Sequence, residues 1–532
     1  MNRKKIESVI LFSLIVYSVY CSIIIGKSWD ESYHYLQGRA IFQYISSFGK
    51  IRKEFFYEEY YSPSYWFFQY FFTQLFPAQY KVETNHIFNL LVSLSTIVGF
   101  SKLISEFFNK YLGKIFFLLL FFYPIFFGHM GMNPKDIVIA CCHVWIFYLI
   151  IRYLKNQSST AKSNKYIYLA SVFLAIGTGT QLLFFGTLAP IFLFLLFEVF
   201  FFKKIIKKDF NNKSLFIDFF KFIIVFYIFL IFFWPAAHSN IILTPYKIFI
   251  KSLSVARGYG FNMVNGEILL SKDVSIFYFY INFFYKSPEF LLFAYLIFLF
   301  FISYFFKFFN KVFFNFLYKF LFLSLFLFMP ILIIKLTSFG VYDGLRLFLW
   351  CLPYFLIIPS LVTYFLIINF KKNIFKCILY IYVLLFIIFF FIFISVTPYH
   401  YTYLNIFSQF GLNSPEKFEG DYWGATIKEL VQKIDFSKYE KIDLITCGIN
   451  RDNLKEYLKV YQNKYIKKIN FVKEENAKYV LMTNRVVYDV GNNVNAFKID
   501  TCFNKYIGTT VVSVSRLGRE LSTIRFLETP IK

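Results

Sequence analysis

Four short polar segments contain the residues best able to do chemistry, and each of them borders a long apolar run. The first, "SWDESYHY" (28–35), carries two adjacent acids, Asp30 and Glu31, and a histidine, His34. If a helix continues from Trp29, Asp30 and His34 stand four residues apart on one face. A carboxylate beside an imidazole can accept a proton from a hydroxyl. A solvated helix start, in which the helix dipole favours acids, explains the same residues without any function.

The second segment, "NPKD" (133–136), ends in Asp136. Asn133 as the N-cap and Pro134 at the first helical position form a good helix start, which is a purely structural explanation. Asp136 would then lie at the mouth of an apolar helix. An acid in that position is costly unless it is paired or used.

The third segment, "YDGLR" (342–346), places Asp343 and Arg346 three residues apart. The two can form a local ion pair. Otherwise Arg346 can hold a phosphate, because its planar guanidinium matches phosphate oxygens. Lys286 in "KSP" and Arg257 in "ARGYG" are further candidate cations.

The fourth segment, "DYWG" (421–424), contains Asp421, Tyr422 and Trp423 and follows "TPYHYTYLN" (397–405) after the last apolar run. Tyrosine and tryptophan at this place fit a belt at the membrane interface, so this segment alone does not indicate a binding site. Its occurrence with the other three segments is what makes it a candidate.

The composition defines the elements that must position these residues. Of 532 residues, 58% are hydrophobic and 24% aromatic, more than a water-soluble core can bury, so we predict a polytopic α-helical membrane protein. A span needs roughly 20 residues. About eleven runs approach this length: 6–26, 84–106, 115–128, 137–154, 166–178, 182–202, 215–234, 289–306, 320–335, 347–370 and 376–396.

The net charge of +25 comes largely from clusters in the short loops between these runs. All the clusters fall on the same side, which predicts that side to be cytoplasmic and argues against a nucleic-acid partner. They are Arg3, Lys4 and Lys5; Lys110 and Lys114; Lys155, Lys162 and Lys165; Lys203, Lys204, Lys207 and Lys208; Lys307, Lys311 and Lys319; and Lys371, Lys372 and Lys376. The basic, apolar start resembles a secretory signal, but it is long and has no small-residue cleavage site, so we interpret it as a retained span.

This orientation puts all four segments on the extracytoplasmic side. The first outer loop (27–83) contains two stretches with helical apolar spacing, near 33–49 and 62–76, which predict amphipathic helices in the interface. The second of them could instead be a true span. Residues 1–434 would form the membrane domain, and 435–532 a small extracytoplasmic α/β domain, in which Cys447 and Cys502 could pair. In this domain "NLKEYLKVYQNKY" predicts a helix, and strands are predicted in "KIDLITCG", "KKINFV", "AKYVLMTN", "TTVVSVSRLG" and "LSTIRFL", the last two as a closing hairpin.

Taken together and in this order, "WDESYHY", "NPKD", "YDGLR" and "YHYTYLN…DYWG" resemble the GT-C superfamily of membrane glycosyltransferases. The resemblance is to family 39-like enzymes, which include protein O-mannosyltransferases and lipid A aminoarabinose transferases, and it covers most of residues 1–430. Relatives commonly have "YDGLRH", whereas Leu347 replaces the histidine here.

The resemblance implies transfer of a sugar from a polyprenyl-phosphate donor to a lipid, glycan or protein acceptor outside the cytoplasmic membrane. It maps the acid near the acceptor hydroxyl onto Asp30 and the second-loop acid onto Asp136. Phosphate leaves without a general acid, so the site needs a base and cations, which we assign to Asp30 and to Arg346 with Lys286 or Arg257. Asp136 could orient the acceptor or hold a divalent cation, and Glu31 and His34 would support Asp30.

Two other classes of function stay open. A transporter or channel could use the outer acids to collect cations, but it should carry charged or broken helices near the middle of the bilayer. The few charges inside the runs, such as Asp218 and Glu198, lie near the cytoplasmic ends, which favours the enzyme. A non-catalytic membrane subunit that recognises glycans through the outer domain is the third possibility.

Overall fold

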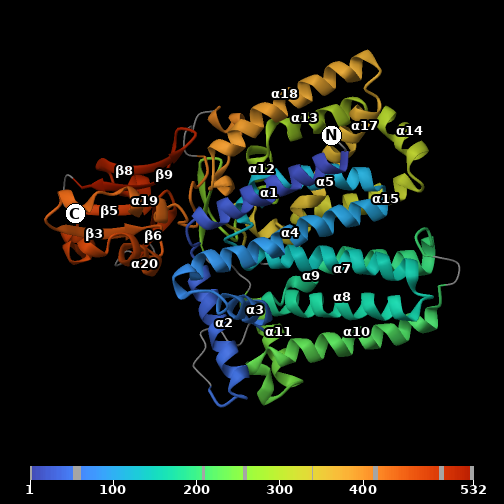
Figure 1. Cartoon of the computed structure of the whole chain (residues 1–532), viewed down its shortest axis with the longest axis horizontal. Helices are drawn as coiled ribbons and strands as arrows, with labels where there is room; N and C mark the ends of the chain where they lie inside the picture. The colour runs from blue at the N-terminus through green and yellow to red at the C-terminus, as the bar shows by residue number, and fades with distance from the viewer. Residues whose placement is uncertain are drawn as a thin grey trace.

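The protein consists of a large helical part and a small unit containing a β-sheet at one of its ends (Figure 1). This computed structural model describes residues 3–51, 61–206, 210–255, 260–337, 340–410, 417–490 and 497–527. Arg257, one of the candidate cations, lies outside the described residues. The N-terminus lies in the helical part, away from the C-terminal unit (Figure 1).

The helical part is built from long antiparallel helices that pack side by side. α7 (Asp136–Asn156) lies between α4 (Lys81–Phe107) and α8 (Thr160–Thr180), and α8 also packs on α10 (Asn212–Phe232) (Figure 1). α1 (Arg3–Ile24) packs on α4. The other helices of this part are α5 (Lys110–Phe121), α6 (Pro124–His129), α9 (Phe184–Phe197), α11 (Leu243–Val255), α12 (Tyr278–Lys286), α13 (Glu289–Phe300), α14 (Ile302–Val312), α15 (Phe316–Ser324), α16 (Met329–Leu336), α17 (Ile357–Ile368) and α18 (Asn373–Ser395).

Seven of the described helical segments are long and apolar enough to cross a membrane, and the pair α12 and α13, bent by 113°, would make an eighth. The outer helices expose large apolar side chains, such as Phe391 of α18 at 68% and Ile228 of α10 at 65%. Hydrocarbon can surround such side chains, whereas water would strongly disfavour so many of them. The chain is therefore a multi-pass membrane protein, as predicted, while the number of eleven spans stays a prediction.

The two amphipathic helices predicted in the first outer loop are present as α2 (Glu31–Ser46) and α3 (Ser64–Thr73). They pack against each other at Gly38, where an added Cβ atom would lie 2.2 Å from the carbonyl oxygen of Trp66. α3 also packs on α4, so α2 is tied to the bundle through its partner. Trp66 of α3 stacks on His34 of α2 and donates its indole N–H to the Pro134 carbonyl, which places the start of α2, and with it Asp30, beside the start of α7.

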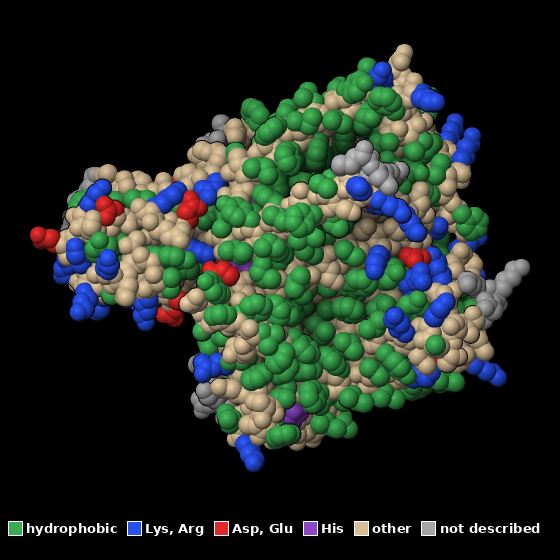
Figure 2. Space-filling view, viewed as in Figure 1, with side chains coloured by type: hydrophobic (Ala, Val, Ile, Leu, Met, Phe, Trp, Pro, Cys, Tyr) green, Lys and Arg blue, Asp and Glu red, His purple; other side chains and the backbone are tan. Residues whose placement is uncertain are grey.

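Lysine and arginine side chains gather at the end of the helical part farthest from the C-terminal unit, while apolar side chains cover its middle (Figure 2). Lys114, Lys203, Lys307 and Lys371 are exposed representatives of the predicted basic loops at that end. The four polar segments that contain the candidate site residues are not at that end. They lie at the opposite end, next to the C-terminal unit.

The C-terminal unit contains a five-stranded mixed sheet in the order β4-β3-β5-β9-β8. The predicted strands are β3 (Ile442–Cys447), β4 (Ile469–Phe471), β5 (Tyr479–Thr483), β8 (Thr509–Arg516) and β9 (Arg519–Phe526), and the predicted helix is α20 (Arg451–Tyr461). A hairpin of β6 (Val486–Val490) and β7 (Phe497–Thr501) is an addition that the sequence reasoning missed. α19 (Ile427–Lys433) packs on α20 and β8.

Cys447 and Cys502 form a disulfide, as the sequence allowed. The unit also shares an apolar core with the helical part, because Ile25, Met132 and Tyr401 pack with residues of α19, α20 and the sheet. A division of the chain at 434/435 remains a prediction.

Candidate active site

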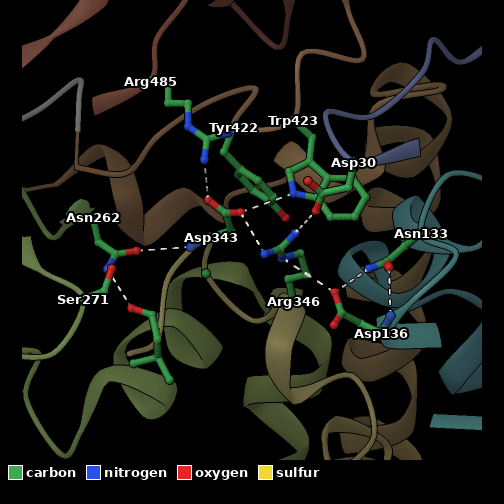
Figure 3. A network of polar contacts seen from close by, with 12 residues as sticks. Asp30, Asn133, Asp136, Asn262, Ser271, Asp343, Arg346, Tyr422, Trp423 and Arg485 are labelled. Carbon is green, nitrogen blue, oxygen red and sulfur yellow. Dashed lines mark hydrogen bonds and ion pairs between the residues drawn. The ribbon is translucent and has the colours of Figure 1, made fainter. Parts of the chain in front are cut away.

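The guanidinium group of Arg346 is the centre of a buried polar network at the end of the helices that faces the C-terminal unit (Figure 3). Its nitrogen atoms face three carboxylates: Nη1 lies 3.4 Å from Asp30 Oδ2, Nε 3.6 Å from Asp136 Oδ2, and Nη2 3.3 Å from Asp343 Oδ2. The aromatic rings of Trp423 and Tyr342 lie against the guanidinium, at 4.8 and 5.0 Å. Residues from three of the four predicted segments thus converge with Trp423 of the fourth.

Asp30 is the most accessible carboxylate of this network. Its side chain is 43% exposed, compared with 9% for Asp136 and 5% for Asp343. Burial opposes the ionisation of Asp30, but the charge of Arg346 together with the charges of Lys135 and Arg485 outweighs it and holds the pKa of that carboxyl below its usual value. Asp30 is therefore an ionised oxygen base that a ligand can reach.

Asp136 is fixed by the "NPKD" turn. The side-chain oxygen of Asn133 accepts from the backbone N–H of Asp136 at 2.9 Å, and its side-chain nitrogen donates to Asp136 Oδ2 at 3.0 Å. α7 begins at Asp136 and not at Pro134 as predicted, because the Pro134 carbonyl accepts from the indole N–H of Trp66; the capping contact expected of Asn133 is nevertheless present. Asn133 thus orients the carboxylate as well as starting the helix.

Asp343 lies in a strained turn, since both Asp343 (φ 58°) and Gly344 (φ 65°) have left-handed backbone conformations. The turn is held by Asn262, whose Oδ1 accepts from the Asp343 N–H at 3.1 Å (Figure 3), and by Tyr278, whose hydroxyl accepts from the Gly344 N–H at 2.9 Å. The strained turn aims the Asp343 carboxylate at Arg346. Neither Asn262 nor Tyr278 belongs to a motif by which sequence reasoning could have found it.

The Asp343 carboxylate is shared by three donors. Besides Arg346, it faces the indole N–H of Trp423, 3.3 Å from Oδ2, and Nη2 of Arg485, 3.6 Å from Oδ1. Arg485 comes from the C-terminal unit (Figure 3) and was not predicted. It has no motif around it, and only the folded chain brings it to the helical part.

Asp421 and Tyr422 lie behind the network and position Trp423. Asp421 is completely buried, and its oxygens accept from the backbone N–H groups of Trp423 and Thr426 and from the hydroxyl groups of Thr426 and Tyr401. The Tyr422 hydroxyl lies 3.0 Å from Nε2 of His129. The hydrogen-bonding capacity of Asp421 is therefore largely used inside its own segment.

Lys286 is buried next to this segment. Its ammonium group occupies the space that a Cβ atom on Gly344 would take and lies 5.8 Å from the Tyr422 ring. Glu419, also buried, is the acid whose charge acts most strongly on Lys286, and burial together with the Asp343 charge raises the pKa of Glu419 to about 7. Lys286 thus lies behind the Asp343 turn.

The contacts of Glu31 and His34 are with residues other than Arg346. Glu31 accepts from the Ser28 N–H at 2.6 Å and pairs with His86 Nε2 at 2.8 Å, while His86 Nδ1 faces the Ser22 carbonyl at 2.8 Å. His34 stacks on Trp66 at 4.4 Å, and burial lowers its pKa to about 3. His34 is therefore a neutral imidazole and a poor proton acceptor. His86, in an apolar helix, was missed.

A divalent cation does not fit this arrangement well. The three carboxylates that could ligate it all face the Arg346 guanidinium, which fills the point where they converge. In the part of the chain that the structure describes, no group of three or more His, Cys, Asp or Glu side chains could hold a metal ion. The positive charge of the site is supplied by protein side chains.

The fold and the site define a multi-pass α-helical membrane protein that displays a buried arginine–carboxylate network at one end. No family model matches the chain, and no curated protein sequence matches it. Among solved structures, it is similar to ArnT from Cupriavidus metallidurans in the apo state, with a TM-score of 0.50, 10% identity and 98% of each chain covered.

Two further structures are similar. ArnT from Cupriavidus metallidurans bound to undecaprenyl phosphate gives a TM-score of 0.49 at 10% identity, with 98% of each chain covered. The archaeal oligosaccharyltransferase AglB from Archaeoglobus fulgidus, in complex with an inhibitory peptide and a dolichol-phosphate, gives 0.43 at 12% identity, with 89% of this chain and 69% of AglB covered. The chain has the fold of ArnT, so the resemblance found in the motifs is confirmed at the level of the fold.

Proposed function

We propose that the protein transfers a sugar from a polyprenyl-phosphate donor to an acceptor hydroxyl on the extracytoplasmic side of the membrane. The observation that carries this proposal is the ion pair between Asp30, which is ionised and partly exposed, and the buried Arg346. This pair lies at the end of the apolar helix bundle that faces the C-terminal unit. The fold shared with ArnT supports it. The acceptor, whether lipid, glycan or protein, would approach from the outer face.

In the proposed reaction Asp30 accepts the proton of the acceptor hydroxyl. The acceptor oxygen attacks the anomeric carbon, the bond from that carbon to the phosphate oxygen breaks, and polyprenyl phosphate leaves with the electron pair. A single displacement inverts the anomeric configuration. No general acid is needed, because phosphate is a good leaving group.

The leaving phosphate needs positive charge. The cations around Asp30 differ in how many carboxylates they already face. Arg346 faces three carboxylates, and its Nε, 3.6 Å from Asp136 Oδ2, is buried without a hydrogen-bond partner. Lys135, beside Tyr61, has Asp136 and Asp30 as its neighbouring carboxylates and is kept charged, with a raised pKa. We assign the phosphate to Arg346 and Lys135, with Lys286 as the cation behind the Asp343 turn.

The other predicted site residues take supporting roles in this proposal. Asp136 and Asp343 fix Arg346 from two sides. Glu31, paired with His86, holds the turn before α2, and the segment Asp421–Trp423 places the indole that covers the guanidinium. The membrane would be the cytoplasmic one, with the N-terminus and the basic loops inside.

A transporter or channel is the second candidate, and the positions of the acids disfavour it. In the seven helical segments long enough to cross a membrane, every acid lies within the first or last two turns: Glu7, Glu83, Glu106, Asp136, Glu198 and Asp218. The acids at the basic end form ion pairs or hydrogen bonds within the protein. For example, Asp218 pairs with Lys221, and Glu198 accepts a hydrogen bond from Tyr318. A cation path would need such groups near the middle of the bilayer.

The experiment that tests the proposal uses the full chain purified in detergent. It is incubated with polyprenyl-phosphate sugars labelled in the sugar and with a panel of lipid, glycan and peptide acceptors. We expect label to move to at least one acceptor class. Cation flux in proteoliposomes, without transfer from any donor, would favour the transporter instead.

A further inference from the structure

Arg485 is the residue through which the C-terminal unit reaches the site. It lies between β5 and β6, and its side chain leaves the unit towards the helical part (Figure 3). Nη1 donates to the Tyr422 carbonyl, Nη2 lies 3.6 Å from Asp343 Oδ1, and the guanidinium lies 5.1 Å from the ring of Trp29, the neighbour of Asp30. One side chain thus contacts both the Asp343 turn and the segment that carries Asp30.

The backbone of Arg485 is anchored inside the C-terminal unit. Its carbonyl accepts from the Cys502 N–H at 2.9 Å, and Cys502 is joined to Cys447 at the end of β3. An added Cβ atom on Gly448 would lie 2.8 Å from Arg485 Cβ and 3.1 Å from Cys502 Sγ, so the arginine is packed against the disulfide. The position of its guanidinium is therefore set by the unit.

The N-terminus of α20 holds the Asp30 segment from another side. The side-chain nitrogens of Asn450 and Asn453 donate to the carbonyls of Trp29 and Ser28 at 3.3 and 3.1 Å. The Ser32 hydroxyl bonds to Asn453 at 2.8 Å. The segments on both sides of Asp30 are consequently held by the same unit that carries Arg485, before it through two backbone carbonyls and after it through the Ser32 side chain.

We propose that Arg485 is a positioning residue of the transfer site: by holding Asp343 and covering Trp29, it fixes Arg346 and Asp30 relative to each other. The inference rests on the proposed function. It gives the C-terminal unit a part in catalysis that no motif of that unit indicates. Misplacing reacting groups by about 1 Å can cost roughly 100-fold in rate, so the effect should be measurable.

The first test is kinetic and uses the full chain with the disulfide intact. We expect Arg485→Ala to lower kcat by about 10- to 100-fold with a smaller change in the donor KM. Arg485→Lys should recover part of the rate, because it keeps the charge but loses the planar fork. Arg451→Ala is the matched control, since Arg451 is an exposed arginine of the same unit that packs on Phe471, and it should keep the wild-type rate.

A double-mutant cycle distinguishes positioning of the site residues from a contact that only holds the C-terminal unit on the helical part. Because Arg485 holds Asp343 and also covers Trp29, adding Arg485→Ala to Asp343→Asn should slow the reaction by a smaller factor than Arg485→Ala slows the wild type. The inference would be overturned if the rate reductions of the two single variants multiplied in the double variant, or if Arg485→Ala kept the wild-type rate.

Hydrogen–deuterium exchange gives a readout that does not need turnover. Arg485→Ala should exchange faster in 28–35 and 340–346 than wild type and Arg451→Ala, and Arg485→Lys should lie between them. Unchanged exchange in both segments would refute the positioning role. A wild type without transfer activity would refute the proposed function, and the exchange result would still decide the role of Arg485.

Discussion

At the scale of single residues, the site is an arginine surrounded by three carboxylates of which one is reachable. Buried charges are costly unless they are paired, and the pairs Arg346–Asp136 and Arg346–Asp343 satisfy this requirement. Asp30 is different because it keeps 43% of its side chain exposed while it still faces the guanidinium. It can therefore give up part of its interaction with Arg346 to an incoming hydroxyl.

Replacing Asp30 tests its role as the base. Asp30→Asn keeps the size of the side chain but removes the proton acceptor, so we expect turnover to fall by about 10²- to 10⁴-fold. Asp452→Asn, at an acid in the first turn of α20 whose side chain is 88% exposed, is the matched control and should leave the rate unchanged. A wild-type rate in Asp30→Asn would remove Asp30 from the chemistry.

The pH dependence should carry the signature of the Arg346–Asp30 pair. Because Arg346 holds the pKa of Asp30 below its usual value, the base stays ionised as the pH falls, and the acid limb of kcat/KM should lie below about pH 3.9. In Arg346→Gln the limb of the residual activity should move to higher pH, since the cation that favours the ionised carboxylate is gone. Identical limbs in both proteins would show that Asp30 does not titrate against Arg346.

At the scale of elements, the site depends on how closely α2 approaches α3. Gly38 makes this approach possible, and α2 begins next to Asp30. We expect Gly38→Ala to destabilise the protein by about 1–3 kcal/mol, because the added methyl group meets the Trp66 carbonyl, and to lower kcat as α2 shifts.

Gly186→Ala is the matched control for this substitution. It places the same methyl group in α9, where nothing lies within 4 Å, and should leave the stability unchanged or raise it. Thermal unfolding in detergent measures both variants. Equal midpoints for Gly38→Ala and Gly186→Ala would contradict the account of the α2–α3 contact.

The elements also show what sequence reasoning could and could not find. Long apolar runs and alternating strand patterns predicted the membrane bundle, α2, α3 and most of the C-terminal sheet, since these depend on local periodicity. Asp30, Asp136, Asp343 and Arg346 could be picked out because unusual polar residues stood beside apolar runs. Arg485, Asn262 and His86 could not be found, because only tertiary contacts bring them to the site.

At the scale of the whole molecule, charge and shape separate two ends. The basic loops lie at the end of the bundle opposite the C-terminal unit (Figure 2). The proposed orientation puts the basic end in the cytoplasm and the active site outside. The Cys447–Cys502 disulfide fits this orientation, because such bonds persist in oxidising compartments.

Cysteine labelling tests the orientation. On a Cys377→Ser background, we expect Lys438→Cys in the C-terminal unit to react with a membrane-impermeant maleimide in sealed right-side-out vesicles. Lys114→Cys in a basic loop should react only after permeabilisation. Both lysines are well exposed, at 73% and 57% of their side chains. The reverse pattern would invert the topology and move the site to the cytoplasmic side.

The central claim is that this site breaks the bond between a sugar and a polyprenyl phosphate. The measurement that tests it most directly is the release of free polyprenyl phosphate from labelled donors by the purified full chain, with and without acceptor. We predict acceptor-dependent release in equal amount to the sugar transferred, and its loss in Asp30→Asn. Release that does not differ between wild type and Asp30→Asn, or no release from any donor, would contradict the account.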